Sequence, residues 1–154
     1  MSQPPPIRHF EDLVPGTVLE FGRYVMSEEE IVAFGRAWDP QPFHTGRDAA
    51  RGSAVGELIA SGWHSCAAIM RMLVDHFVAA DSFLPSPGID ELRWLAPVRP
   101  GDTLSLRLTV LEARASQSRP DRGILRIRNE AFNQRREPVV SFISIVMLRR
   151  RGAG

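Results

Sequence analysis

The sequence contains no lysine, and all 19 of its Lys and Arg residues are arginine. Without lysine, the chain offers neither a Schiff-base nucleophile nor the lysine of a phosphate-binding P-loop. Cys66 is the only cysteine, which excludes an internal disulfide and a cysteine-rich metal site. The 4 histidines are not spaced with acidic residues as metal ligands usually are, so we expect no metal site.

Long apolar runs are also missing. No run approaches the roughly 20 residues that a helix needs to span a bilayer, and the first residues, MSQPPPIRHF, lack the apolar core of a signal peptide. The formal net charge is only +1, so no strong field favours nucleic acid or a membrane surface as a partner. We therefore expect a cytoplasmic protein that binds neither nucleic acid nor membranes.

The length and composition are those of one globular domain. The chain has 154 residues, of which 44% are hydrophobic and 24% are charged. We expect a single domain over residues 1–154, with a loose proline-rich arm at 1–8. The closing residues 150–154 are predicted to be a flexible basic tail.

The first third of the chain predicts a strand followed by a helix. Residues 17–26 alternate between apolar and polar types and place Leu19, Phe21 and Val25 on one face of a strand. Ser27 is then positioned as the N-cap of a helix, with Glu30 as its capping-box partner. This helix should stop before Pro40, because the residue that precedes a proline is pushed out of the α region.

Residues 39–58 are rich in proline, glycine and small polar residues, and we predict a long irregular segment there. A long helix is expected over 61–80. Its broad apolar face is predicted to include Trp63, Cys66, Ile69, Met70, Leu73 and Phe77. A narrow opposite stripe, predicted to face solvent or an interface, holds His64, Ala68, Arg71 and Asp75, the last two as an i,i+4 ion pair.

The second half of the chain predicts an antiparallel sheet. An extended stretch at 89–95 and a turn at 97–102 precede three further strands, at 103–113, 124–133 and 139–148. The first of these strands alternates and places Leu104, Leu106, Leu108 and Val110 on one face. The strand at 139–148 is apolar on both faces, which is typical of a sheet centre or of a subunit interface. The order of elements predicts an α+β fold in which a curved antiparallel sheet wraps one long helix.

The stretch DPQPFH places a carboxylate, Asp39, and an imidazole, His44, on either side of two prolines, Pro40 and Pro42. Prolines restrict the backbone and so favour a defined placement of the two side chains. An acid and a base held together are suited to proton transfer. From the spacing alone, a helix C-terminal turn with exposed polar residues explains the same pattern, and this alternative stays open.

Three stretches together resemble a known family. They are FGRAWDPQPFHTGRDAA (34–50), IASGWHSCA (59–67) and ELRWLAPVRPGDTL (91–104). In this order they are similar to the MaoC-like dehydratases, also called R-specific enoyl-CoA hydratases or hydratase 2, which have the hotdog fold. The resemblance extends roughly from residue 10 to residue 149. It implies a hotdog domain in which the long helix lies at the centre of the sheet.

The resemblance also implies roles for individual residues. Asp39 and His44 match the catalytic aspartate and histidine, and Gly62 matches the glycine whose backbone N–H begins the oxyanion hole. The sequence departs from the family at Gln41, where asparagine is expected, and at Trp38, where glycine is usual. Further residues expected to bind substrate or line its pocket are Ser61, Gln41, Trp38, Phe43 and Trp63.

The activity implied is addition of water to an enoyl thioester of coenzyme A, or removal of water from a 3-hydroxyacyl thioester, as in fatty acid metabolism. This reaction needs no metal or redox cofactor, since coenzyme A is part of the substrate. A homodimer, or a higher assembly of dimers, is expected because pairing between subunits covers open sheet edges.

Two alternatives to this activity stay open. One is a hotdog acyl-CoA thioesterase, which would use a carboxylate on the long helix, where Asp75 is the only acid. The other is a non-catalytic acyl-CoA-binding homologue, which the departures at Trp38 and Gln41 favour. Release of free thiol would identify the first, and binding of an acyl-CoA without turnover would identify the second.

Overall fold

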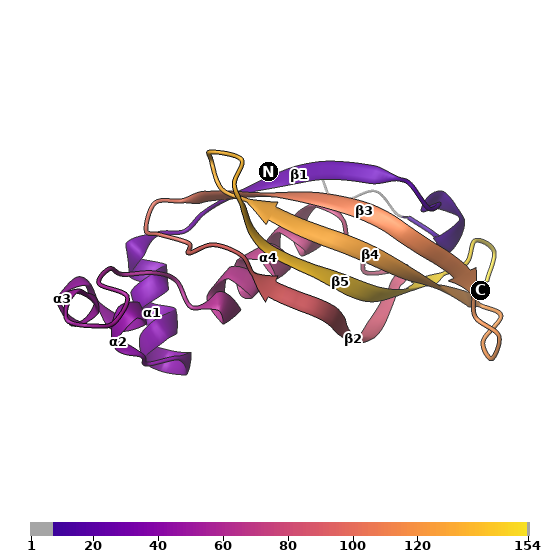
Figure 1. The fold of residues 1–154 in the computed structure, drawn as a ribbon. Coiled ribbons are helices and arrows are strands. Elements are labelled where there is room, and N and C mark those ends of the chain that lie inside the picture. Colours follow the sequence, from indigo (N-terminus) through magenta and orange to yellow (C-terminus); the bar gives the residue numbers. More distant parts are fainter. Residues whose placement is uncertain (1–7, 154) are drawn as a thin grey trace.

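The computed structural model describes residues 8–153 as one antiparallel sheet curved around a central helix (Figure 1). The sheet has 5 strands in the order β1-β3-β4-β5-β2. Their bounds are β1 (Val18–Val25), β2 (Phe83–Trp94), β3 (Thr103–Ala115), β4 (Arg122–Phe132) and β5 (Pro138–Arg149). The predicted α+β class and the predicted antiparallel sheet are both confirmed.

One long helix lies along the inner face of this sheet, the helices between β1 and this long helix gather at one end of the sheet, and a short 3-10 helix lies at the other end (Figure 1). Their bounds are η1 (Phe10–Asp12), α1 (Glu28–Trp38), α2 (Pro42–Thr45), α3 (Arg47–Arg51) and α4 (Gly62–His76). The long helix α4 ends earlier than the predicted residue 80, with Phe77 as its C-cap. Within residues 8–153, no helix is long and apolar enough to cross a membrane.

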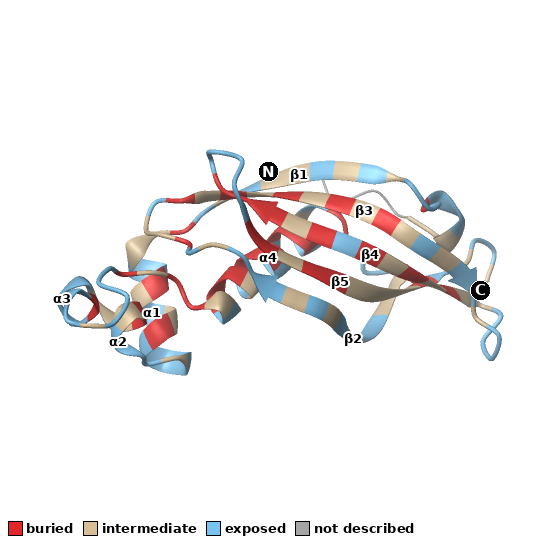
Figure 2. Cartoon of the chain, in the orientation of Figure 1, coloured by how far each residue is buried: buried red, intermediate tan, exposed pale blue. Residues whose placement is uncertain are grey.

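The core lies between α4 and the middle strands of the sheet, where buried residues alternate along β3 and β4 (Figure 2). The inward side chains of β3 are the four that the sequence predicts, and they pack with α4. These core residues include Leu104, Leu106, Leu108 and Val110 of β3, Leu125 and Ile127 of β4, and Ile69, Met72 and Leu73 of α4. The period of two in the sequence thus identified the buried face of β3.

The predicted apolar face of α4 is partly wrong. Trp63 and Met70 are 56% and 48% exposed, whereas His64 and Ala68, predicted to face solvent or an interface, are buried. The reason is that α1 packs beside α4, and the ring of its Phe34 stacks on His64 at 5.0 Å. The other half of the predicted stripe, the ion pair between Arg71 and Asp75, is present in the structure.

The predicted face of β1 changes partway along the strand. Leu19 and Phe21 are partly buried against the core, but Val25 is exposed. The pairing of β1 with β3 shifts register between Phe21 and Tyr24, where Gly22 has a positive φ of 88°. An extra residue in one strand reverses the side-chain alternation beyond it, which turns Val25 to the outer face.

The predicted start and end of α1 are confirmed. The Ser27 hydroxyl accepts a hydrogen bond from the backbone N–H of Glu30, as an N-cap does. The carboxylate of Glu30 accepts from the Tyr24 hydroxyl, a contact that the capping-box prediction did not include. The helix ends at Trp38, and Asp39 is its C-cap before Pro40.

Residues 39–58 are more regular than predicted, because they contain α2 and α3. Pro42 is the first residue of α2, where a proline costs no hydrogen bond, since the first amides of a helix have no intrahelical acceptor. The prolines that indicated an irregular segment therefore start a helix here. The N-cap of α2 is Gln41, and its third residue is His44.

The strand β2 is longer than the predicted extended stretch and forms an edge of the sheet. Pro85 and Pro87 lie in its first half, where the pairing with β5 is irregular between Leu84 and Gly88. Prolines are tolerated on edge strands because their missing N–H can face away from the neighbouring strand. β5 lies between β4 and β2, so the strand predicted to be apolar on both faces is inside the sheet.

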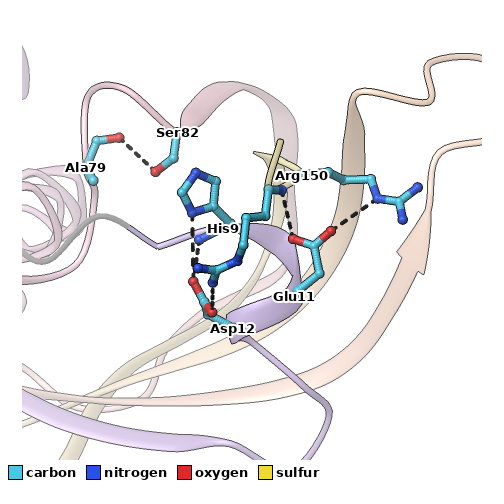
Figure 3. A network of polar contacts seen from close by, with 7 residues as sticks. His9, Glu11, Asp12, Ala79, Ser82 and Arg150 are labelled. Atoms are coloured by element: carbon cyan, nitrogen blue, oxygen red, sulfur yellow. Dashed lines mark hydrogen bonds and ion pairs between the residues drawn. The ribbon is translucent and has the colours of Figure 1, made fainter. Parts of the chain in front are cut away.

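The two ends of the described chain are tied together. The predicted flexible arm at 1–8 falls outside the described residues except for Arg8. The tail predicted over 150–154 is held at two positions: Arg150 pairs with Glu11 at 3.2 Å (Figure 3), and the guanidinium of Arg151 pairs with Asp12. The backbone N–H of Arg151 also donates to Glu11.

Candidate active site

Asp39 and His44 lie side by side. Asp39 ends α1, and the short helix α2 begins three residues later and carries His44. The Nε2 atom of His44 is 3.3 Å from Oδ2 of Asp39. The His44 side chain is buried, and that of Asp39 is partly exposed. The bend that contains Pro40 and Pro42 therefore brings the predicted acid and base into contact.

Two neutral side chains hold the Asp39 carboxylate. The amide of Gln41 donates to Oδ1 at 2.8 Å, and the hydroxyl of Ser61 donates to Oδ2 at 2.7 Å. The Gln41 hydrogen bond, and after it the Ser61 hydrogen bond, lower the pKa of Asp39 against the opposing effect of burial. Hydrogen bonds to a carboxylate favour its charged form, so Asp39 is ionised at neutral pH.

The orientation of the His44 ring is set by the backbone carbonyl of Ile59, which lies 2.8 Å from Nδ1. A carbonyl oxygen can only accept, so the hydrogen on the neutral ring belongs to Nδ1. The lone pair of Nε2 then points toward the Asp39 carboxylate. Two facing acceptors are suited to a hydroxyl or water that donates to both, which is the arrangement needed to activate a nucleophilic water.

Gly35 in α1 makes this contact between the helices possible, although the sequence analysis did not single it out. A Cβ at Gly35 would lie 2.1 Å from the backbone oxygen of His44. Any other residue would therefore push α2 away from α1. A glycine inside a predicted helix is unfavourable by itself, and this was the sequence signal that could have identified it.

The start of α4 faces the same site. Ser61 is the N-cap residue, but its side chain makes no capping bond and instead donates to Asp39. The first backbone bond of the helix runs from the N–H of Ser65 to the carbonyl of Ser61 at 3.1 Å. The N–H groups before Ser65, beginning with Gly62, have no intrahelical acceptor and together with the helix dipole favour negative charge.

The indole of Trp94 packs directly on Gly62. A Cβ at Gly62 would lie 2.3 Å from Cε2 of Trp94, so a larger residue would clash with the ring. Trp63 meets the same indole edge to face, with ring centres 5.2 Å apart. The family resemblance assigned Gly62 to the start of the oxyanion hole. The structure adds Trp94, at the end of β2, as the side chain that occupies this surface.

A cavity of about 460 Å³ unites these groups. Its polar wall is formed by Asp39, Gln41 and His44, and its other walls come from α4, the end of β2 and β5. The lining residues include Phe43, Gly62, Trp63, Ser65, Trp94 and Val140. Phe43 and Trp63, two of the residues expected at a substrate pocket, both line this cavity. Trp38 does not line the cavity and is 78% exposed, so it does not obstruct the site.

The remaining candidate residues lie apart from this cavity. Asp75, the carboxylate considered for a thioesterase, pairs with Arg71 in the last turns of α4. His64 is buried, and its Nδ1 has no hydrogen-bond partner among residues 8–153. Burial raises the pKa of the Cys66 thiol, which keeps it protonated at neutral pH. No group of three or more potential metal ligands occurs in the described part of the chain.

Comparison with known proteins identifies the fold and the family of this chain. A sheet curved around one long helix is the hotdog architecture; a similar solved structure, from Mycobacterium tuberculosis, is described as a double hotdog fold. That structure matches with a TM-score of 0.78 at 20% identity, over 95% of this chain and 45% of the other. The chain belongs to the MaoC-like domain family, whose sequence profile matches residues 11–127.

Individual relatives agree with this assignment. A structure of a MaoC-like dehydratase from Rhodospirillum rubrum is 41% identical, with a TM-score of 0.86 over 94% of this chain and 98% of that chain. The R-hydratase PhaJ1 from Pseudomonas aeruginosa is 25% identical, with a TM-score of 0.73 over 93% and 86% of the two chains.

A curated relative is longer than this chain. Protein MaoC from Klebsiella aerogenes is 33% identical over 103 residues, which are 66% of this chain but 30% of that protein. The chain therefore matches under a third of that relative's length.

Proposed function

We propose that the protein adds water to an enoyl thioester of coenzyme A, or removes water from the corresponding 3-hydroxyacyl thioester. The observation that carries this proposal is the contact between Asp39 and His44. Their facing acceptor atoms are 3.3 Å apart at the wall of the cavity, with the imidazole tautomer set by Ile59. A single water that donates to both groups would be held with its oxygen free to attack.

Each proton in this reaction has a place to go. As the water oxygen bonds to Cβ of the enoyl group, the Asp39–His44 pair accepts one proton from the water. The pair then returns a proton to Cα, so that H and OH are added and no proton is consumed. Dehydration follows the same path in reverse. General acid–base groups placed in this way each increase the rate by a factor of roughly 10²–10⁴.

Negative charge on the thioester oxygen would be stabilised at the start of α4. The backbone N–H of Gly62 has no intrahelical acceptor, and it lies beside the cavity that Asp39 and His44 line. Loss of one such donor typically lowers kcat by a factor of about 10²–10³. Side chains and backbone amides of this chain thus suffice for every step, and we propose that coenzyme A enters only as part of the substrate.

The test is the rate of crotonyl-CoA hydration, followed by loss of the enoyl absorbance, in Asp39→Asn and His44→Ala. Each substitution should lower kcat/KM by roughly 10²–10⁴. Asp75→Asn is the matched control, because it also neutralises a carboxylate but lies in the surface pair with Arg71. Unchanged rates in both site variants would end the proposal.

The same assay separates the two alternative activities. A thiol reagent added to the reaction would detect the free coenzyme A that a thioesterase releases. Asp75, the carboxylate on which that alternative depended, is not among the residues lining the cavity. The non-catalytic alternative predicts binding of crotonyl-CoA with no change of absorbance. Trp38, one of the two departures that favoured it, is exposed outside the cavity.

We further propose a homodimer formed through α4 and the outer edge of β2. This surface exposes five large apolar side chains, and no strand pairs with the outer edge of β2 within residues 8–153. The five are Trp63, Met70, Ile89, Trp94 and Leu95. Exposed apolar patches bordering an open edge are typical of interfaces. A chain that elutes as a monomer at micromolar concentration in size-exclusion chromatography with light scattering would contradict the dimer.

A further inference from the structure

A second cavity, of about 420 Å³, lies farther along α4 and is almost entirely apolar. Its walls come from α4, β2 and β5, the same three elements that close the first cavity opposite α2. The lining residues include Cys66, Met70, Leu73, Ile89, Phe142 and Val146. No Asp, Glu, Arg or His is among them, so the chemistry of this space suits a hydrocarbon chain.

The residues that line the two cavities are near neighbours on two elements, α4 and β5. Along α4, the lining passes from Ser65 in the first cavity to Cys66 in the second. Along β5 it passes from Val140 to Phe142. Along β2, Trp94 lines only the first cavity. The spaces therefore adjoin at one turn of α4, next to the last residue of β2.

The Trp94 indole lies at this junction. It covers Gly62, and the Cys66 thiol, which lines the second cavity, is close enough that the ring partly offsets the burial that raises the Cys66 pKa. Gly62 and Cys66 are four residues apart and so lie one above the other on a single helix face. The ring consequently spans the turn of α4 at which the first cavity gives way to the second.

We infer that Trp94 is a specificity-determining residue that limits the length of the acyl chain. This inference rests on the proposed function. A thioester oxygen at the Gly62 N–H and a Cβ beside Asp39 and His44 leave the rest of the acyl group pointing along α4. A short acyl group ends before the indole, whereas a longer one meets the ring and reaches the apolar cavity only if the ring is displaced.

The test compares kcat/KM for octenoyl-CoA with that for crotonyl-CoA in the wild type and in Trp94→Ala. Each methylene that gains an apolar site is worth roughly a fourfold change. Octenoyl-CoA has four more methylenes than crotonyl-CoA, so we expect the octenoyl-to-crotonyl ratio to rise at least about tenfold. Trp38→Ala is the matched control, because this exposed tryptophan lines neither cavity and its removal should leave the ratio unchanged.

Two further variants protect the test from indirect effects. If Trp94→Ala does not fold, Trp94→Leu takes its place in the test. This variant keeps an apolar side chain at the junction and should also raise the octenoyl-to-crotonyl ratio of kcat/KM. In the Trp94→Ala background, Met70→Trp places a large ring on the wall of the second cavity and should return the ratio toward the wild-type value. A ratio that stays at the wild-type value in a folded Trp94→Ala or Trp94→Leu protein overturns the inference.

Binding of saturated thioesters distinguishes failure of the inference about Trp94 from failure of the proposed hydratase function. Kd values for butyryl-CoA and octanoyl-CoA, measured by calorimetry, require no turnover. If no enoyl thioester reacts but Trp94→Ala still gains affinity selectively for octanoyl-CoA, the inference holds and the hydratase assignment fails. If crotonyl-CoA reacts, but Trp94→Ala changes neither the octenoyl-to-crotonyl ratio of kcat/KM nor the ratio of the Kd values for octanoyl-CoA and butyryl-CoA, the inference fails and the proposed function stands. A wild type that already prefers octanoyl-CoA as strongly as Trp94→Ala also overturns it.

Discussion

Replacement of Gly35 by alanine should damage the site, although Gly35 itself does not line the cavity. In an isolated helix this change is favourable by about 1 kcal/mol, because glycine is a poor helix former. In the folded protein the new Cβ would lie 2.1 Å from the His44 carbonyl oxygen, where ordinary contact begins at 3.4 Å, so α1 and α2 must separate by about 1.3 Å. The clashing atom belongs to the backbone, which cannot rotate away.

The clash should outweigh the propensity gain. Overpacking of this kind costs about 1–3 kcal/mol, and we expect a net loss of roughly 1–2 kcal/mol in the free energy of unfolding. Because α2 carries His44, the imidazole should move relative to Asp39. A misplacement of about 1 Å can lower a catalysed rate by roughly 10². Urea denaturation and crotonyl-CoA kinetics measure the two effects independently.

Gly52→Ala is the matched control for this prediction. Gly52 follows α3 with a φ of −83°, which any residue adopts, and a Cβ there would meet only the Ala49 carbonyl at 3.9 Å. This variant should keep both wild-type stability and wild-type kcat/KM. A Gly35→Ala protein that is more stable than the wild type and equally active would refute the reasoning, because helix propensity would then have prevailed over the helix contact.

Three more predictions follow from individual residues. Gln41→Leu removes the main cause of the lowered Asp39 pKa, so an NMR titration of the variant should show a higher pKa for Asp39. The stability that ionised Asp39 contributes is present above its unfolded pKa of about 3.9, and it is lost as the pH falls through the folded pKa. Burial lowers the pKa of His64, so the free energy of unfolding should fall as the pH drops below the unfolded pKa of about 6.5. His64→Phe keeps the stack on Phe34 and removes the titrating group, so urea titrations between neutral and mildly acidic pH should show a smaller loss of stability. Leu106→Ala, at a fully buried position, should lower the free energy of unfolding by about 2–5 kcal/mol, and a loss below about 1 kcal/mol would contradict its place in the core.

The elements governed by local rules could be predicted from the sequence. The N-cap at Ser27 and the stop before Pro40 depend on neighbouring backbone groups, and both agree with the structure. The buried face of β3 follows from a period of two that no bulge interrupts near its start. The contact between Asp39 and His44 was also expected, because the stiff segment that joins them is short.

Features that depend on distant segments were not predictable in the same way. The buried side of α4 is set by α1 and not by the helix's own apolar pattern, which is broad enough to suit more than one orientation. The carbonyl of Ile59 and the indole of Trp94 reach the site through tertiary packing, and neither has a local motif. The first half of β2 was missed because Pro85 and Pro87 are unfavourable in a strand unless it is an edge strand.

The ion pairs of Glu11 and Asp12 with Arg150 and Arg151 have a practical consequence for experiments on this protein. They hold η1 beside the end of β5, while α1, α2 and α3 lie at the opposite end of the sheet (Figure 1). A purification tag, a fluorophore or a surface anchor attached after residue 153 would therefore project away from the cavity. Immobilised protein should retain the access to thioesters that it has when free, so binding can be measured on a sensor surface.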